Sequence, residues 1–327
     1  MTGAIQVEGL VRTYGNTRAV DGLSIVVRES EVYGFIGPNG AGKTTTLRIL
    51  STLLAPTSGT VTVAGIDIER DPHSVRRLIG VALQESGLDG MQTSEEILAF
   101  HGRLQGLRGK SLKRGVERAI ACLGVEGFAS ERISTLSGGM KRRLDIAIAL
   151  VHSPAILFLD EPTVGMDPTS RRTLWEEISR LRRDEGTTVF LTTQYLDEAD
   201  QLADRIGIIA GGQLKAEGSP ADLKKALQRD VVNVTVSSRD DEDAEQIVKL
   251  TENNEATISA AHSNGVVSIQ SLNGDITMAH MLEIVASASI GISDISLRRP
   301  TLDDVFIELT SEMSAASTGR EDNENGA

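Results

Sequence analysis

The 327-residue sequence contains one cysteine, Cys122, so no disulfide can form within the chain and a secreted, disulfide-stapled scaffold is excluded. Aromatic residues are scarce, with one Trp, three Tyr and six Phe, so the cores must consist mainly of Leu, Ile, Val and Ala. No stretch of about 18 uninterrupted apolar residues occurs, and residues 1–10 lack the pattern of a signal peptide. We therefore expect the chain to work in a reducing compartment. We also expect any membrane role to depend on a partner.

Basic residues are rare in the C-terminal third of the chain. Residues 1–230 carry 29 acidic and 28 basic side chains, whereas residues 231–327 carry 17 acidic and 5 basic ones. This imbalance predicts two domains, with a boundary between residues 229 and 230. The formal net charge of −13 argues against a protein that coats nucleic acid by bulk electrostatics, so we expect no nucleic-acid partner.

Residues 1–229 alternate between strand and helix patterns, which predicts an α/β domain with a mainly parallel sheet covered on both faces. The expected strands are residues 5–8, 24–27, 31–36, 61–63, 79–83, 155–160, 188–192 and 206–210, and the expected helices are 44–54, 170–184, 196–203 and 221–229. Helical periodicity over residues 95–105 and 113–123 predicts that about 88–150 is a helical subdomain.

Residues 230–312 have a different order of elements. The pattern is strand, helix, strand, strand, helix, strand, which is the order of an α+β ferredoxin-like module. The expected strands are 231–236, 257–261, 266–270 and 292–298, and the expected helices are 241–253, 276–289 and 301–309. Residues 313–327 are small, polar and acidic, and we expect a disordered tail there.

A glycine-rich loop follows the expected strand at residues 31–36 and precedes a helix. It matches the phosphate-binding loop pattern in full and runs Gly37, Pro38, Asn39, Gly40, Ala41, Gly42, Lys43, Thr44, with Thr45 next. Backbone N–H groups of such a loop wrap phosphates, and the helix N-terminus adds positive potential. Lys43 is expected to reach the β- and γ-phosphates and the Thr44 hydroxyl to bind Mg²⁺. An ordinary glycine-rich turn does not account for the complete pattern.

An apolar strand ends in two carboxylates, Asp160 and Glu161. Alone, such an end is more often a solvated edge. Together with a phosphate-binding loop, Asp160 is expected to hold Mg²⁺ through water, and Glu161 is expected to polarise the attacking water. The two motifs predict hydrolysis of a nucleoside triphosphate.

A second candidate anion site opens the helix that begins near residue 138. Ser137, Gly138 and Gly139 precede Met140 and three basic residues. A merely capped helix is the alternative, but Lys and Arg in a first turn oppose the helix dipole. With two phosphate-binding helix starts in one chain, we expect a nucleotide to lie between two copies arranged head to tail.

This ordered set of motifs resembles the nucleotide-binding subunits of ATP-binding cassette (ABC) transporters over about residues 4–220. The resemblance implies a P-loop NTPase cassette with a RecA-like core, an antiparallel β subdomain and a helical subdomain. It implies that Tyr14 stacks on adenine, Gln84 senses Mg²⁺ and the γ-phosphate, and Asp167 couples the two sites of a dimer. Ser137, Gly138 and Gly139 then form the signature of the family.

Two positions depart from the usual pattern of that family. Met140 stands where the signature usually has Gln, and Gln194 stands where the switch residue is usually His. A Gln can donate a hydrogen bond to the γ-phosphate but cannot carry a proton charge. We expect hydrolysis to persist without titration of this position near neutral pH.

Three longer segments, residues 136–144, 192–206 and 299–306, resemble the daunorubicin/doxorubicin-resistance ATP-binding subunits. That resemblance extends into the C-terminal domain. It implies a homodimer that binds ATP and Mg²⁺ and energises a separate membrane permease, which exports hydrophobic drugs or lipids. The chain would then lie on the cytoplasmic face of the membrane, attached through the permease.

Two other functions remain to be weighed. A soluble cassette ATPase of translation or DNA repair normally has two cassettes or a long coiled-coil insertion, and this chain has one phosphate loop and no sustained heptads. A binding module without catalysis would not need Lys43, Asp160 and Glu161.

The C-terminal domain could bind a regulator, brace the dimer or dock on the permease. We favour bracing, and the resemblance implies a role in assembly.

Overall fold

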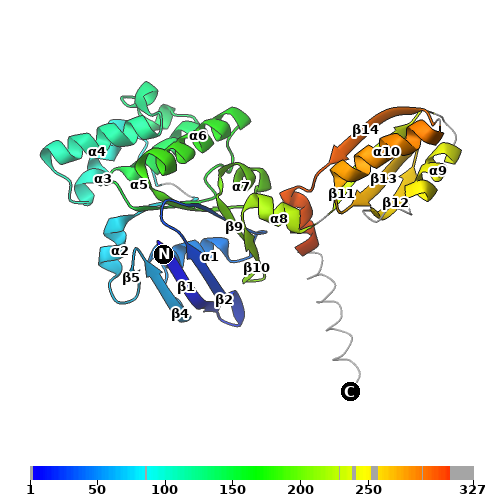
Figure 1. Cartoon of the computed structure of the whole chain (residues 1–327). Helices are drawn as coiled ribbons and strands as arrows, with labels where there is room; N and C mark the ends of the chain where they lie inside the picture. Colours follow the sequence, from blue (N-terminus) through cyan, green and yellow to red (C-terminus); the bar gives the residue numbers. More distant parts are fainter. Residues whose placement is uncertain are drawn as a thin grey trace, which may run out of the picture. The chain divides into compact units, whose positions relative to one another are not determined.

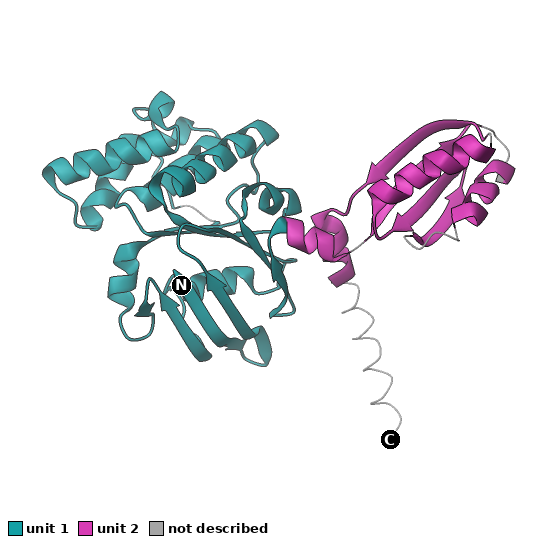
Figure 2. Ribbon diagram, viewed as in Figure 1, with its two compact units in different colours: residues 1–220 teal, residues 221–327 magenta. Residues whose placement is uncertain are grey.

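The computed structural model describes residues 3–84, 87–227, 229–237, 241–251, 257–288 and 290–309. The chain forms two compact units, residues 1–220 and 221–327 (Figure 2). The division falls at the start of helix α8 (Pro220–Ala226), whereas the charge pattern placed it after this helix. The acidic tail expected at residues 313–327 lies outside the described residues.

A six-stranded sheet with the order β10-β9-β3-β8-β7-β6 forms the centre of the first unit. Its strands are β3 (Val32–Ile36), β6 (Ile79–Ala82), β7 (Ile156–Asp160), β8 (Thr188–Thr193), β9 (Arg205–Ala210) and β10 (Gln213–Gly218). Every neighbouring pair is parallel except β9 and β10. The expected parallel sheet is confirmed, and β10 is an additional antiparallel edge strand.

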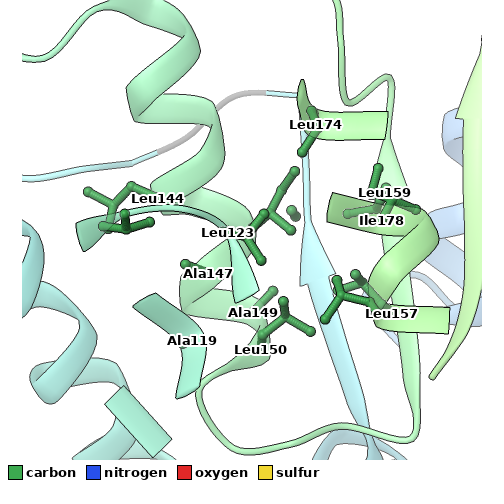
Figure 3. Packing of buried hydrophobic residues seen from close by; sticks show 14 of the residues in the cluster. Ala119, Leu123, Leu144, Ala147, Ala149, Leu150, Leu157, Leu159, Leu174 and Ile178 are labelled. Carbon is green, nitrogen blue, oxygen red and sulfur yellow. The ribbon is translucent and has the colours of Figure 1, made fainter. Parts of the chain in front are cut away.

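Helices cover both faces of this sheet (Figure 1). Those that contact its strands include α1 (Lys43–Leu50), α5 (Gly138–Leu150), α6 (Pro168–Glu185) and α7 (Leu196–Leu202), and α4 (Gly109–Cys122) packs on α5 and α6. Leu157 and Leu159 of β7 pack with α4, α5 and α6 (Figure 3), whereas Ile156 and Phe158 pack on the opposite face with α1. Successive residues of a strand point to opposite faces of the sheet. Because both faces are covered here, β7 is apolar along its length up to Asp160.

An antiparallel sheet with the order β2-β1-β4-β5 lies below the central sheet in Figure 1 and shares the core on the α1 side. Its strands are β1 (Ile5–Tyr14), β2 (Thr17–Val27), β4 (Ser58–Val63) and β5 (Ile66–Asp67). Helix α2 (Pro72–Leu78) follows β5 and was not expected from the sequence. This sheet is the antiparallel subdomain that the resemblance implied.

The helical subdomain comprises α3, α4, two short 3-10 helices and α5. The elements not yet bounded are α3 (Ser94–Leu104), η1 (Glu126–Phe128) and η2 (Ile133–Thr135). A reciprocal capping box begins α3, because the Thr93 hydroxyl accepts from the Glu96 N–H while the Glu96 carboxylate accepts from the Thr93 N–H. The predicted helical character of this region is confirmed.

The second unit contains β11 (Asp230–Val236), α9 (Asp241–Thr251), β12 (Thr257–Ser263), β13 (Val266–Ser271), α10 (Gly274–Ala288) and β14 (Ile292–Arg298). The strands form an antiparallel sheet with the order β12-β13-β11-β14, which confirms the ferredoxin-like module. Val232, Val234 and Ile269 belong to its separate core. Residues 302–309 form a last helix. No helix in the described ranges has the length and hydropathy needed to cross a membrane.

Candidate functional site

The loop between β3 and α1 has a shape that only glycine permits at two positions. Gly42 has a φ of 104°, and a Cβ atom there would lie 2.3 Å from the Ala19 carbonyl oxygen. A Cβ atom on Gly37 would lie 2.3 Å from the carbonyl oxygen of Ile209. Because any side chain would collide with backbone, these glycines let the loop pack tightly and turn directly into α1.

Lys43 is folded back into this loop. Its Nζ atom donates hydrogen bonds to the carbonyl oxygens of Gly37, at 2.8 Å, and Pro38, at 3.2 Å. The same atom lies 3.5 Å from Oε1 of Glu161. Burial lowers the pKa of Lys43 below its usual value, and the charge of Glu161 opposes that shift. The loop therefore holds one ammonium group beside its own backbone and beside the end of β7.

Asp160 is buried at the end of β7 and accepts two hydroxyl hydrogen bonds. Its Oδ1 atom accepts from Thr44 Oγ1 at 3.1 Å and from Thr192 Oγ1 at 2.7 Å. Thr192 pairs with Asp160 in the register of β7 and β8. No sequence motif points to a role for Thr192, and the register of β7 and β8 is what reveals it.

Glu161 occupies a strained backbone conformation. Its φ is +46°, a region that favours glycine, and its N–H donates to the carbonyl oxygen and to Oγ1 of Thr192, both at 3.1 Å. These bonds hold the turn that brings the Glu161 side chain back toward Lys43. Backbone strain of this kind is concentrated at functional sites.

A cavity of about 550 Å³ lies at the carboxyl ends of the parallel strands. Its lining consists of Ala19, Asn39, Gly40, Gly42, Lys43, Thr44, Thr45, Gln84, Glu161, Val164 and Gln194. The structure thus brings together residues from four separate sequence motifs. Ligands of open α/β sheets bind at this edge, so the position suits a nucleotide.

The other predicted residues lie outside the lining of this cavity. Tyr14 is 46% exposed, and the Arg12 guanidinium lies 4.7 Å from the centre of its ring. Ser137 is exposed at the start of α5, where its hydroxyl accepts from the Met140 N–H at 3.3 Å. Asp167 caps α6 by accepting from the N–H groups of Thr169 and Ser170. Hydrogen bonding with Ser170 lowers the pKa of Asp167.

The signature residues lie beside the start of α6. Gly138 and Gly139 open α5, and a Cβ atom on Gly139 would lie 3.0 Å from Oγ of Ser170. The first turns of α5 and α6 are therefore in close contact. Ser137 and Gly138 are exposed next to this contact, so a ligand could reach the N–H groups of the α5 start from outside the chain.

The donor set fits a magnesium nucleotide. Loop N–H groups and a buried ammonium match phosphate oxygens, and the tight glycine positions leave the loop backbone free to approach them. The hydroxyl of Thr44, the carboxylate of Asp160 and the amide of Gln84 supply oxygen ligands, which Mg²⁺ prefers.

The two sheets, the phosphate loop and the helical subdomain define an ABC-type nucleotide-binding cassette. The family model "ABC transporter" matches residues 20–164. The family model "ATP-binding protein DrrA1-3-like, C-terminal domain" matches residues 218–310. Both matches agree with the two units of the structure.

Comparison with individual proteins gives a more specific family. The daunorubicin/doxorubicin resistance ATP-binding protein DrrA of Streptomyces peucetius is 43% identical over 314 residues, which cover 94% of this chain and 93% of that protein. The chain therefore belongs to this family of ABC-transporter ATP-binding proteins. Its ability to bind ATP follows from membership of the family.

Two solved structures are similar to the cassette. The chain matches cbiO1 from Clostridium perfringens, part of the ABC transporter complex cbiONQ, with a TM-score of 0.64 and 25% identity over 68% of this chain and 91% of that chain. It matches the ATP-binding cassette MJ0796, in a dimeric post-hydrolysis state bound to ADP and Pi, with a TM-score of 0.60 and 27% identity over 66% of this chain and 98% of that one.

Proposed function

We propose that this chain is the ATP-hydrolysing subunit of a membrane exporter and that it works with a separate permease. The cavity that gathers Lys43, Thr44, Gln84, Glu161 and Gln194 carries the proposal. An ABC cassette has no pathway for a transported molecule of its own. The resistance named for its Streptomyces relative favours hydrophobic drugs or lipids as the exported class.

The chain's own residues divide the work of hydrolysis. The loop N–H groups and Lys43 bind the β- and γ-phosphates, and Gln194 donates a hydrogen bond to the γ-phosphate. Thr44, Asp160 and Gln84 would hold Mg²⁺, which when bound neutralises phosphate charge. Tyr14 stacks on the adenine.

Glu161 polarises the attacking water. In the structure its carboxylate is paired with Lys43, so phosphate oxygens that bind Lys43 compete for that ammonium group. The exchange leaves the Glu161 carboxylate able to accept a hydrogen bond from the water. During this exchange, the strained turn and the bonds to Thr192 keep the Glu161 carboxylate at the end of β7.

The active form is a head-to-tail homodimer. The exposed start of α5, with Ser137, Gly138 and Gly139, lies outside the cavity of its own chain, so a nucleotide in that cavity can meet this helix start only from a second copy. Asp167, at the neighbouring start of α6, couples the two sites in this proposal. The dimeric cassette MJ0796 supports this arrangement.

The permease would hold the chain at the cytoplasmic face of the membrane. Its cytoplasmic helices are expected to dock on the helical subdomain near Gln84, so that closure and opening of the dimer move the transport pathway. The C-terminal unit has its own core. We propose that it braces the assembly.

The catalytic part of the proposal is tested with two variants. Glu161→Gln should bind ATP without turnover and elute as a dimer in size-exclusion chromatography with MgATP. Lys43→Ala should neither hydrolyse ATP nor dimerise, because the phosphates lose their main cation. A Glu161→Gln chain that stays monomeric with ATP would contradict the head-to-tail dimer.

The transport part is tested by co-purification. A tagged full-length chain expressed in its host should bring down a polytopic membrane protein, and the chain without residues 221–327 should lose that partner or lose ATPase coupling to it. An unchanged partner yield and an unchanged ATPase rate after the deletion would contradict the assembly role. Recovery of ribosomal or DNA-repair proteins instead would contradict the exporter.

A further inference from the structure

Arg142 lies in α5, one turn after the signature residues, and its guanidinium points into the protein. It donates hydrogen bonds to the carbonyl oxygens of Asp160, at 2.7 Å, of Pro162, at 3.0 Å, and of Leu83. It also donates to the carboxylate of Asp145 at 3.0 Å. One side chain of the helical subdomain thus binds the backbone at the ends of β6 and β7.

The three carbonyl groups flank the two residues that face the nucleotide cavity from these strand ends. Leu83 directly precedes Gln84, and Asp160 and Pro162 enclose Glu161. Arg142 does not line that cavity, and its guanidinium nitrogens are hydrogen-bonded to these carbonyl groups and to Asp145. It acts on the backbone from which the cavity residues project.

Asp145 completes the site as the counter-charge. The Arg142 and Asp145 side chains are only 11% and 16% exposed, and they are three residues apart on α5. Burial raises the pKa of Asp145 to about 6, and Arg142 opposes that shift. A buried guanidinium without this partner would be an uncompensated charge.

The residue type at position 142 suits these contacts. The contacts of its guanidinium account for an arginine here. A planar fork with five N–H donors can serve several acceptors at once, which a lysine ammonium cannot do with the same geometry.

We propose that Arg142, held by Asp145, is a positioning residue for ATP hydrolysis that fixes Gln84 and Glu161 in one cavity. Arg142 and the signature residue Ser137 lie on the same two turns of α5. Engagement of that helix start by the nucleotide of a second copy therefore moves the backbone on both sides of Glu161. This inference rests on the proposed ATPase function. It adds a physical connection, through Arg142, between the start of α5 and the backbone around Glu161.

The test compares full-length variants in steady-state MgATP hydrolysis and in equilibrium binding of a fluorescent ATP analogue. For Arg142→Ala we expect kcat to fall by about 10- to 100-fold while the Kd for the analogue changes by less than about threefold, because Lys43 and its loop remain in place. Arg142→Lys should also lose turnover, since one ammonium cannot reach all three carbonyls. Arg114→Ala, an exposed arginine of the same subdomain, is the matched control and should keep the wild-type rate.

A double variant separates positioning from structural support. Arg142→Met with Asp145→Leu removes the buried ion pair without leaving an unpaired charge, so this chain should stay folded, with a cooperative thermal transition, and still lose turnover. Wild-type turnover in that double variant, or in Arg142→Lys, would overturn the inference. A wild-type chain that binds ATP but hydrolyses none, alone or with its permease, would instead overturn the proposed function.

Discussion

The Nζ atom of Lys43 lies 3.5 Å from Oε1 of Glu161, and the two side chains are only 4% and 9% exposed. This ion pair connects the phosphate loop after β3 with the end of β7. Both members belong to the site in which we place the chemistry. The pair therefore affects the stability of the fold as well as the reaction.

Removing Lys43 should destabilise the folded chain as well as abolish hydrolysis. In Lys43→Ala the buried carboxylate of Glu161 loses its cation, and we expect the free energy of unfolding to fall by about 1 to 3 kcal/mol. Urea denaturation measures this loss. Lys113→Ala is the matched control, because Lys113 pairs with Glu117 on an exposed surface and should cost at most about 1 kcal/mol.

A double variant tests the cause of that loss. Adding Glu161→Gln to Lys43→Ala removes the unpaired charge, so part of the lost stability should return. If Lys43→Ala is no less stable than Lys113→Ala, the pair contributes nothing to folding and the prediction is wrong.

Gln194 should make the ATPase rate insensitive to titration at the switch position. Glutamine has no pKa in the accessible range, whereas a histidine there titrates near pH 6.5. Between pH 6 and 8, Gln194→His should gain a transition in kcat beyond any that the wild type and Gln194→Ala share. Buried acids elsewhere titrate equally in all three chains, so the difference between their profiles isolates position 194. A wild-type transition that vanishes in Gln194→Ala, with folding intact, would contradict this prediction.

Glu177 of α6 should make the chain less stable as the pH rises. Burial raises the pKa of Glu177 from 4.5 to about 7, although Arg143 lies 3.7 Å away and opposes the shift. The unfolded chain loses this proton near pH 4.5 and the folded chain near pH 7. The stabilisation that Glu177 contributes is therefore fully present below pH 4.5. As the pH rises to about 7, the free energy of unfolding falls by about 3 kcal/mol because this stabilisation is lost.

The measurement for Glu177 is the free energy of unfolding at pH 5 and at pH 8. Glu177→Gln should show a smaller decrease between the two pH values than the wild type. Glu176→Gln changes an exposed neighbour on the same helix and should follow the wild type. Equal decreases in all three chains would show that Glu177 titrates normally.

Cys122 should be inert to alkylation in the folded chain. The pKa of the thiol is raised from 9.0 to about 12, mainly by burial. A hydrogen bond from its Sγ atom to Glu185 at 3.0 Å and the charge of that carboxylate add to the shift. The thiolate population at pH 8 should then fall by about a thousandfold. Since the chain has one cysteine, the rate of reaction with iodoacetamide, native against urea-unfolded, reports on this thiol alone. Equal native and unfolded rates would refute the shift, and Cys122→Ser gives the blank.

Strand β10 and helix α2 are among the elements that were absent from the sequence-based prediction, and each has a physical reason. Strand β10 is an edge strand of mostly half-buried residues that forms by pairing with β9, and its own pattern has little apolar alternation. Helix α2 has seven residues and one buried side chain, so its periodicity is too short to detect. Its start signal, Asp71 as cap followed by Pro72, was nevertheless present in the sequence.

The sequence alone determined the phosphate loop, the carboxylates at the end of β7 and the signature residues. It also determined the change of charge between residues 1–230 and 231–327. These features are local, because each depends on neighbouring residue types, on a strand or helix period, or on the backbone freedom of glycine. The ferredoxin-like unit was also predictable, since its order of elements can be read along the chain.

Only the tertiary structure decided which of these residues meet. The bond between Thr192 and Asp160 depends on the register of two strands, and the contacts of Arg142 depend on how α5 packs against the sheet. Neither register nor packing is encoded by spacing along the chain, because both arise when apolar faces far apart in sequence are buried together. The same burial places Lys43 against Glu161 and leaves the start of α5 exposed outside its own cavity.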